Sequence, residues 1–91
     1  MNKSHPFDKS RPFDLICMGR VAVDFYADQI HSPLEHAQSF SRYLGGCAGN
    51  ISVGTSRLGL KSAMFSCVGT DDMGVFLRNQ LQFEGVDTFL L

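Results

Sequence analysis

A glycine-rich stretch and an isolated aspartate are the features of this sequence whose residue types suit chemistry. Residues 45–50 read GGCAGN, and Asp24 interrupts an apolar run, VAVDFYA, at positions 21–27. Glycine lets a backbone N–H group approach a ligand because it has no Cβ. A carboxylate accepts hydrogen bonds, and an asparagine amide, here that of Asn50, both donates and accepts them. Together these groups could bind the hydroxyls of a small molecule.

Binding of a phosphate or a dinucleotide is a competing interpretation of the glycines. A phosphate loop requires the pattern G-x-x-x-x-G-K-[ST] between a strand and a helix. The nearest match, GTSRLGLKS at 54–62, fails because Leu60 stands before Lys61 and because its glycines lie within and after a predicted helix. The dinucleotide pattern G-x-G-x-x-G also fails, since no two glycines of the stretch are separated by one residue.

A purely structural role is the other interpretation. Gly45 and Gly46 can supply unusual backbone angles at a turn from a strand into a helix, with Asn50 as the helix cap. Asp24 can be an exposed residue on a strand that has one face in solvent, although a carboxylate that faces a core needs polar partners. The neighbouring residues alone leave the structural and the binding interpretations open.

Composition and charge restrict the class of partner. The chain has 91 residues, of which 44% are hydrophobic and 19% charged, as is typical of a globular domain. Its formal net charge is −1 with no run of like charges. Nucleic acids and acidic membrane surfaces require a basic patch, so we expect neither as a partner and expect a small molecule instead.

Membrane spans, signal peptides and metal sites have no sequence signature here. No apolar run approaches the roughly 20 residues of a membrane helix, and the polar segment MNKSHPFDKSRP lacks the apolar core of a signal peptide. We therefore expect a cytoplasmic protein. Cys17, Cys47 and Cys67 fit neither a disulfide framework nor the C-x-x-C spacing of a zinc site, so we expect reduced thiols and no metal.

Apolar periodicity predicts the elements that must position these residues. Short apolar runs that end at glycines are typical of buried strands, and the i, i+3, i+4 pattern is typical of helices. The third strand is expected to pair back on the second. The predicted elements are strands at 13–19, 21–27, 39–44 and 62–68, a loop at 28–38, helices from Ala48 to Gly59 and from Asp71 to Gly85, and the start of a further strand at Val86.

Strands that alternate with helices imply an α/β fold, in which a parallel sheet carries helices on both faces. Two helices cannot cover both faces of such a sheet, so residues 13–91 are expected to be the first section of a larger α/β domain. Residues 1–12 contain two prolines and no apolar periodicity. We expect this segment to be a disordered leader.

Four motifs resemble, in order and spacing, the N-terminal part of the ribokinase-like PfkB carbohydrate kinases. They are GRVAVD at 19–24, GGCAGN at 45–50, Gly59 and VGTDDMG at 68–74, and the resemblance runs from about Phe13 to the last residue. Two longer segments, DLICMGRVAVDFYADQI and YLGGCAGNISVGTSRLGLKSAM, resemble more narrowly one member of the family, a kinase of inositol catabolism.

The resemblance implies a Rossmann-like sheet with a small β lid, formed by strands within 21–44, in a kinase that uses ATP and Mg²⁺. It places Asp24 in the acceptor site, where the family aspartate accepts hydrogen bonds from sugar hydroxyls. Gly45, Gly46 and Asn50 fall on family positions that bind the same sugar or sugar acid. The lid often pairs with that of a second copy, which implies a homodimer.

Three further residues lie within or beside these motifs. Thr70 stands where many members have an acidic residue, at a turn that starts a helix. Cys47 fills a variable position, where a small residue fits; redox sensitivity and contact with the substrate are the alternatives. Arg20 can pair with Asp24, bind the carboxylate of a sugar acid, or be a solvated surface residue.

The catalytic motif of the family, a late G-A-G-D type sequence whose aspartate is the base, is absent from these 91 residues. The chain is therefore expected to be the N-terminal third of a kinase, with no catalytic residue, no bound ATP and no activity alone. The alternative is a stand-alone sugar-binding or dimerisation module. Such a module would expose the apolar faces of the strands at 15–18 and 63–68, which favours aggregation.

Overall fold

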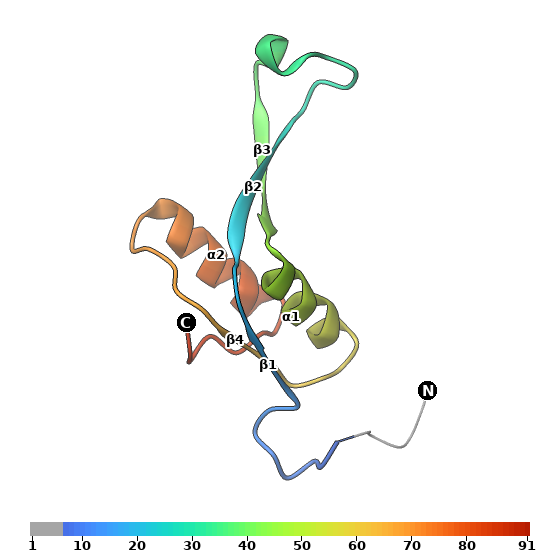
Figure 1. Cartoon of the computed structure of the whole chain (residues 1–91), viewed down its shortest axis with the longest axis vertical. Coiled ribbons are helices and arrows are strands. Elements are labelled where there is room, and N and C mark those ends of the chain that lie inside the picture. Colours follow the sequence, from blue (N-terminus) through green and yellow to red (C-terminus); the bar gives the residue numbers. More distant parts are fainter. Residues whose placement is uncertain (1–6) are drawn as a thin grey trace.

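The structure is a computed structural model and describes residues 7–91. It consists of a body with two helices and a parallel strand pair, from which a long β-hairpin projects (Figure 1). The elements in chain order are β1 (Leu15–Met18), β2 (Ala22–Ala27), the 3₁₀ helix η1 (Leu34–His36), β3 (Phe40–Gly45), α1 (Cys47–Arg57), β4 (Ser62–Phe65) and α2 (Asp72–Phe83).

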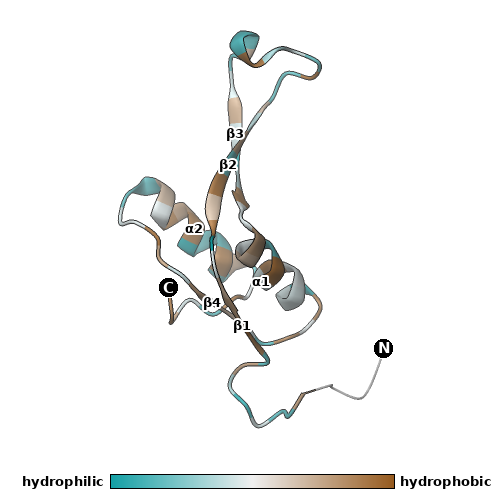
Figure 2. Cartoon of the chain, in the orientation of Figure 1, coloured by the Kyte–Doolittle hydropathy of each residue, from teal (hydrophilic) through white to brown (hydrophobic). Residues whose placement is uncertain are grey.

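The body is built on the parallel pairing of β1 with β4. Cys17 pairs with Met64 in this register, and a single parallel bridge joins Ala63 to Asp87. Parallel pairing and the covering helices confirm the predicted α/β class. Hydrophobic colour concentrates in β1 and β4, whereas η1 at the hairpin tip is largely hydrophilic (Figure 2).

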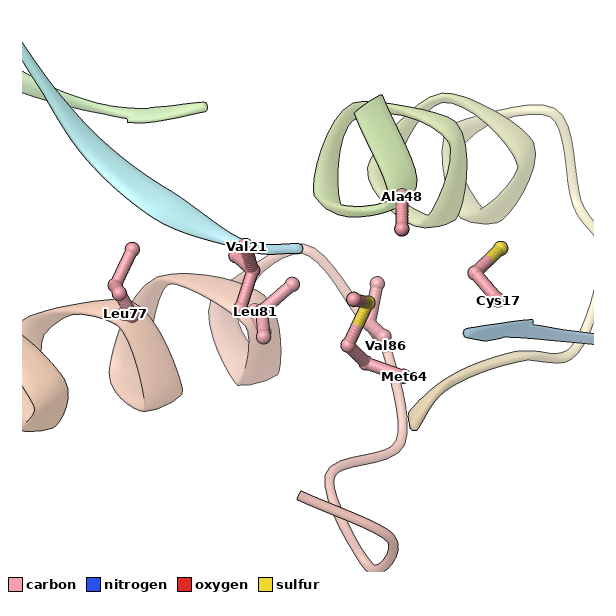
Figure 3. Packing of buried hydrophobic residues seen from close by; sticks show 7 residues of the cluster. All are labelled: Cys17, Val21, Ala48, Met64, Leu77, Leu81 and Val86. Atoms are coloured by element: carbon pink, nitrogen blue, oxygen red, sulfur yellow. The ribbon is translucent and has the colours of Figure 1, made fainter. Parts of the chain in front are cut away.

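One core cluster fills the space between the strand pair and both helices (Figure 3). Leu81 of α2 and Met64 of β4 are fully buried at its centre. Side chains alternate between the two faces of a strand, so the neighbours of Cys17 and Met64 lie on the opposite face. The cluster consists of Cys17, Val21, Ala48, Met64, Leu77, Leu81 and Val86.

That opposite face of the strand pair exposes three apolar side chains, although Ala63, the ladder partner of Ile16, is fully buried. Ile16, Met18 and Phe65 are 47%, 76% and 49% exposed. Met18 and Phe65 are partners in the β1–β4 register, so their side chains share this face. Residues 7–91 thus cover one face of the sheet with helices and leave apolar side chains on the other.

Both strands of the body are shorter than predicted. The predicted strand at 13–19 forms β only at Leu15–Met18, and the predicted strand at 62–68 ends at Phe65. Gly19 has a φ of 152° and turns the chain toward the hairpin, so the residues after Phe65 have no strand beside them. The predicted strand start at Val86 yields a single bridge, at Asp87.

Helix α1 begins at Cys47 with Gly46 as its N-cap, so the interpretation of Asn50 as the helix cap is wrong. Gly46 is the N-cap residue with a φ of 90°, and Asn50 is the fourth residue of the helix. The Asn50 backbone N–H donates to the Gly46 carbonyl oxygen at 2.9 Å, which is an ordinary helical bond. The left-handed angle at Gly46 sets the helix start because only glycine adopts it without strain.

Helix α2 agrees with its prediction at both ends. The Asp71 side chain caps it by accepting a hydrogen bond from the Gly74 N–H at 3.0 Å. A Cβ at Gly74 would lie 1.8 Å from the Gly69 carbonyl oxygen, so this close approach requires glycine. The chain leaves the helix through Gly85, whose φ is 83°.

The hairpin confirms the predicted pairing of the third strand with the second. β2 and β3 are antiparallel, from Ala22 opposite Gly45 to Ala27 opposite Phe40. The Ser41 hydroxyl of β3 also donates, at 2.5 Å, to the side chain of Asp28, which directly follows β2, and this bond lowers the pKa of the Asp28 carboxyl. The hairpin is therefore held by ladder and surface hydrogen bonds rather than by a core of its own.

The predicted disordered leader lies only partly within the described residues, because residues 1–6 are outside them. Residues 7–12 form turns, in which Asp8 accepts from the Ser10 backbone and hydroxyl. The Lys61 Nζ donates to the carbonyl oxygens of Lys9 and Arg11, which ties this segment to the start of β4. The boundary between leader and domain stays a prediction.

Candidate functional site

Asp24 and Gly45 lie against each other at the base of the hairpin. Asp24 is half-buried in β2, and its partner across the ladder is Tyr43 of β3. A Cβ on Gly45 would lie 2.1 Å from the Asp24 Oδ2 atom. Since real atoms do not approach so closely, glycine at this position is what allows the carboxylate its place. The Asp24 carboxylate, a hydrogen-bond acceptor, is thus packed directly against the backbone of Gly45.

Gly46 makes a second close approach, to the backbone of Arg20. A Cβ on Gly46 would lie 2.5 Å from the Arg20 carbonyl oxygen, which also accepts from the Gly49 N–H at 3.3 Å. The paired glycines therefore serve two contacts, one with the Asp24 side chain and one with the chain entering β2. Both the binding and the packing interpretations of the motif are compatible with this geometry.

The side chain of Arg20 is exposed. Within residues 7–91 no salt bridge joins it to Asp24, so of its three interpretations the pairing with Asp24 is not found. Within the described part of the chain no partner of the Arg20 guanidinium is found, so this side chain could pair with a ligand anion.

Asn50 does not lie in the same recess as Asp24. It lines a cavity of about 240 Å³ between β3, α1 and α2, and Asp24 is not among the lining residues. The structure thus brings Asp24, Gly45 and Gly46 together and places Asn50 one turn into α1, where it lines a separate cavity. The cavity is lined by Tyr43, Leu44, Asn50, Val53, Arg57, Gln80 and Glu84.

Two of the lining residues, Arg57 and Glu84, form a bidentate ion pair. The Arg57 Nε and Nη2 atoms donate to the two oxygens of Glu84 at 2.8 and 2.6 Å. The hydrogen bonds lower the pKa of Glu84 and raise that of Arg57. Because both carboxylate oxygens are engaged, this pair joins the ends of α1 and α2 rather than serving as an acid or base.

Two tyrosines that the sequence interpretation missed share a hairpin face with Asp24. Tyr43 is the direct ladder partner of Asp24, and Tyr26 lies two positions after Asp24 in β2. Their rings meet edge to face, with centroids 5.5 Å apart at 60°. The i+2 spacing from Asp24 is the signal that could have identified Tyr26, because alternate strand residues share a face.

The cysteines and the acidic residues add no metal centre to this site. Within residues 7–91 no group of three or more His, Cys, Asp or Glu side chains could hold a metal ion. Cys47 and Cys67 are exposed, and Cys17 is buried, which raises its thiol pKa. All three are free thiols.

Comparison with known proteins shows which protein family this chain belongs to. The family model described as pfkB family carbohydrate kinase matches residues 13–91. The chain belongs to the pfkB family. The 5-dehydro-2-deoxygluconokinase of Clostridium tetani is 47% identical over 81 residues, which are 89% of this chain and 24% of that protein. The enzyme of the same name from Geobacillus kaustophilus is 41% identical over 83 residues, 91% of this chain and 25% of that protein.

Solved pfkB structures confirm the fold. A PfkB protein from Polaromonas sp. JS666 matches with a TM-score of 0.79 and 35% identity, over 87% of this chain and 26% of that one. A sugar kinase from Pyrococcus horikoshii, solved in complex with ATP, matches with a TM-score of 0.78 and 34% identity, over 84% and 25%. The chain thus spans about a quarter of the length of its pfkB relatives.

Both resemblances of the sequence are confirmed, to the ribokinase-like pfkB family and, more narrowly, to 5-dehydro-2-deoxygluconokinase. Among the described residues no helix is long and apolar enough to span a bilayer.

Proposed function

We propose that this chain forms the acceptor side of an ATP-dependent kinase that phosphorylates a hydroxyl of 5-dehydro-2-deoxygluconate, a sugar acid. The observation that carries the proposal is the Asp24 carboxylate packed on Gly45, in a segment 41–47% identical to kinases of that name. A carboxylate held at the base of a projecting hairpin suits the recognition of adjacent hydroxyls, since its two oxygens accept from both.

Each residue of the proposed site has a distinct task. Asp24 accepts hydrogen bonds from acceptor hydroxyls, and Gly45 and Gly46 allow the acceptor to reach the backbone. Asn50 donates and accepts at the neighbouring cavity, and Arg20 pairs with the carboxylate that distinguishes a sugar acid from a neutral sugar. ATP and Mg²⁺ complete the proposal for the whole kinase. The metal neutralises charge on the transferred phosphoryl group, and no residue of this chain is assigned to hold it.

The hairpin acts as the lid in this proposal. It extends beyond the body and carries the acceptor carboxylate at its base, so its closure over a bound sugar would exclude water, which competes as a phosphoryl acceptor. A homodimer through the lid is part of the proposal, supported by the 84% and 71% exposure of Ile30 and Leu34 at the hairpin end. Ile30→Asp should then shift the complete kinase from dimer to monomer in sedimentation equilibrium.

Phosphoryl transfer by the 91 residues alone is not expected, because it needs a nucleotide site and charge stabilisation in addition to an acceptor site. The test uses a coupled ATP-turnover assay on the chain and on a chimera, in which residues 13–91 replace the matching segment of the Clostridium tetani kinase. We expect turnover of 5-dehydro-2-deoxygluconate by the chimera and none by the chain.

Asp24→Asn in the chimera should lower kcat/KM by at least about tenfold, because a charged hydrogen-bond acceptor is lost. Asp28→Asn, which alters a carboxylate farther along the hairpin, is the matched control and should leave kcat/KM near that of the parent chimera. Equal losses in the two variants would count against an acceptor role for Asp24. Turnover by the 91-residue chain, or a monodisperse and exchange-protected dimer that binds the sugar acid, would favour the stand-alone module.

A further inference from the structure

The hairpin face that carries Asp24 is occupied by two tyrosine rings. In the ladder Asp24 is opposite Tyr43, and Tyr26 is opposite Ser41. Directly paired residues of an antiparallel ladder point to the same face, so the carboxylate and both rings lie on one side of the hairpin. The next pair toward the body, Ala22 with Gly45, is small and leaves the Asp24 side of the rings uncovered.

These rings do not serve a core. Tyr26 is 57% and Tyr43 53% exposed, and neither belongs to the buried cluster or to the side chains packed on it. Within residues 7–91 neither phenol hydroxyl makes a hydrogen bond. Two exposed aromatic residues that contact each other beside a carboxylate form a surface with an apolar wall and unused polar groups.

The opposite hairpin face is organised differently. There Val23 and Leu44 pack on the body core, and Arg42 lies over the Phe76 ring of α2, 4.5 Å from its centroid. That face anchors the hairpin to the body. The Tyr26 and Tyr43 face is therefore the one left available to a ligand.

Resting on the proposed function, we infer that Tyr43 and Tyr26 are specificity-determining residues that form an aromatic wall for the acceptor. A sugar acid has a hydroxyl edge and an apolar C–H face. Asp24 binds the edge while the Tyr43 ring packs on the C–H face, with Tyr26 supporting it edge to face. An aromatic ring supplies a large rigid contact area together with a polar handle, here its hydroxyl. The wall selects acceptors by shape, independently of the nucleotide.

The kinetic test uses the chimera described above, with Tyr43→Ala and Tyr43→Phe. Tyr43→Ala should raise the KM for 5-dehydro-2-deoxygluconate about tenfold, with kcat and the KM for ATP nearly unchanged, because the lost contact exists in both ground and transition states. Tyr43→Phe keeps the ring and should stay within about twofold of the parent. Tyr26→Ala, which removes only the supporting ring, should have a smaller effect than Tyr43→Ala.

Phe25→Ala is the matched control. Phe25 lies in the same hairpin with a similar exposure, 60%, but on the opposite face, as the ladder partner of Arg42. It should leave the acceptor KM unchanged. An equal rise of that KM in Phe25→Ala and Tyr43→Ala would overturn the inference, because it would show a general loss of hairpin stability.

A second measurement does not depend on a variant that folds. Tetranitromethane nitrates accessible tyrosine rings, and peptide mass spectrometry locates the modified residues. Saturating acceptor should protect Tyr43 and Tyr26 in the chimera, whereas ATP alone should not. Acceptor turnover that depends on Asp24 but gives no protection of either ring would overturn the aromatic wall and leave the proposed function standing. Absence of acceptor turnover in the chimera would overturn both.

Discussion

The body and the hairpin of this chain are held together by different means. In the body, Met64 and Leu81 are completely buried and both helices pack on one strand pair. Exposure rises from 7% at Val21, a core residue directly before β2, to 60% at Phe25 within β2. The hairpin thus leaves the core within a few residues and continues as a two-stranded ribbon.

Because only the body has a buried core, we expect the body to determine folding and the hairpin junction to determine acceptor binding. A two-stranded ribbon is only marginally stable in water by itself, so the hairpin depends on the body for its position. Asp24, Gly45 and Gly46 lie where the ribbon leaves the core, and a carboxylate there is close to rigid backbone while remaining accessible. Substitutions in the body should therefore act on folding, and substitutions at the junction should act on acceptor binding.

Leu81→Ala should have the largest effect, because it should destabilise the body and, with it, the hairpin. Leu81 is completely buried at the centre of the core, and removal of a buried leucine side chain costs about 3 kcal/mol. Urea titration followed by circular dichroism should show this loss in the free energy of unfolding, with the hairpin signal lost in the same transition. Phe83→Ala, on the same helix but 82% exposed, should change stability by less than about 0.5 kcal/mol.

Gly45→Ala should separate binding from folding. The new methyl group would displace the Asp24 side chain, which can move because it is the end of a side chain rather than backbone. We expect an acceptor KM raised about tenfold in the chimera, equivalent to about 1.4 kcal/mol, with a smaller loss of stability. Gly54→Ala is the control, since a Cβ there meets nothing within 4 Å. It should raise stability by about 0.5–1 kcal/mol and leave the KM unchanged.

Asp71→Ala should weaken the body alone. The substitution removes the side-chain cap of α2, whose acceptor oxygen lies 3.0 Å from the Gly74 N–H. Loss of such a cap costs about 1 kcal/mol. The free energy of unfolding should fall by this amount while the acceptor KM of the chimera stays constant. A changed KM at unchanged stability would contradict the division between body and hairpin.

The Arg57–Glu84 pair should give the smallest effect, visible only in acid. The hydrogen bonds between Glu84 and Arg57 lower the pKa of Glu84 in the folded chain. The contribution of the pair is therefore present above the ordinary glutamate pKa and is lost as pH falls through the lowered folded value. Glu84→Gln should flatten this part of the stability profile between neutral and acid pH. Glu35→Gln, at an exposed position in η1, leaves the pair intact and should retain the slope.

Features that depend on local sequence were predictable. The amphipathic pattern of α2, its start near Asp71 and the glycine after it involve neighbours within a few residues, and the structure agrees with them. The pairing of β2 with β3 followed from alternation and the intervening turn residues. The family motifs likewise led to the correct fold, because their order and spacing are preserved.

Features that depend on distant contacts or backbone angles were not predictable. The N-cap of α1 is Gly46 because this residue adopts a positive φ. The general preference for asparagine at N-caps gives no information about that backbone angle. The partnership of Tyr43 with Asp24 depends on ladder register, and a shift by one residue would have moved the ring to the other face. The ion pair of Arg57 with Glu84 joins residues 27 positions apart. The roles assigned to Arg20 and Asn50 stay predictions.

The sequence separation of contacting residues also indicates which of the two regions forms first during folding. The hairpin end is closed by Gln29 and Ser39, 10 positions apart, whereas the β1–β4 pair brings Asp14 to Lys61, 47 positions away. Hairpins close in about 1–10 μs, and long-range parallel pairing is slower because a larger loop must be ordered first. The ribbon that bears Asp24 can therefore form transiently many times before the body exists. Lasting order at the proposed acceptor site therefore depends on the slow step, the pairing of β1 with β4.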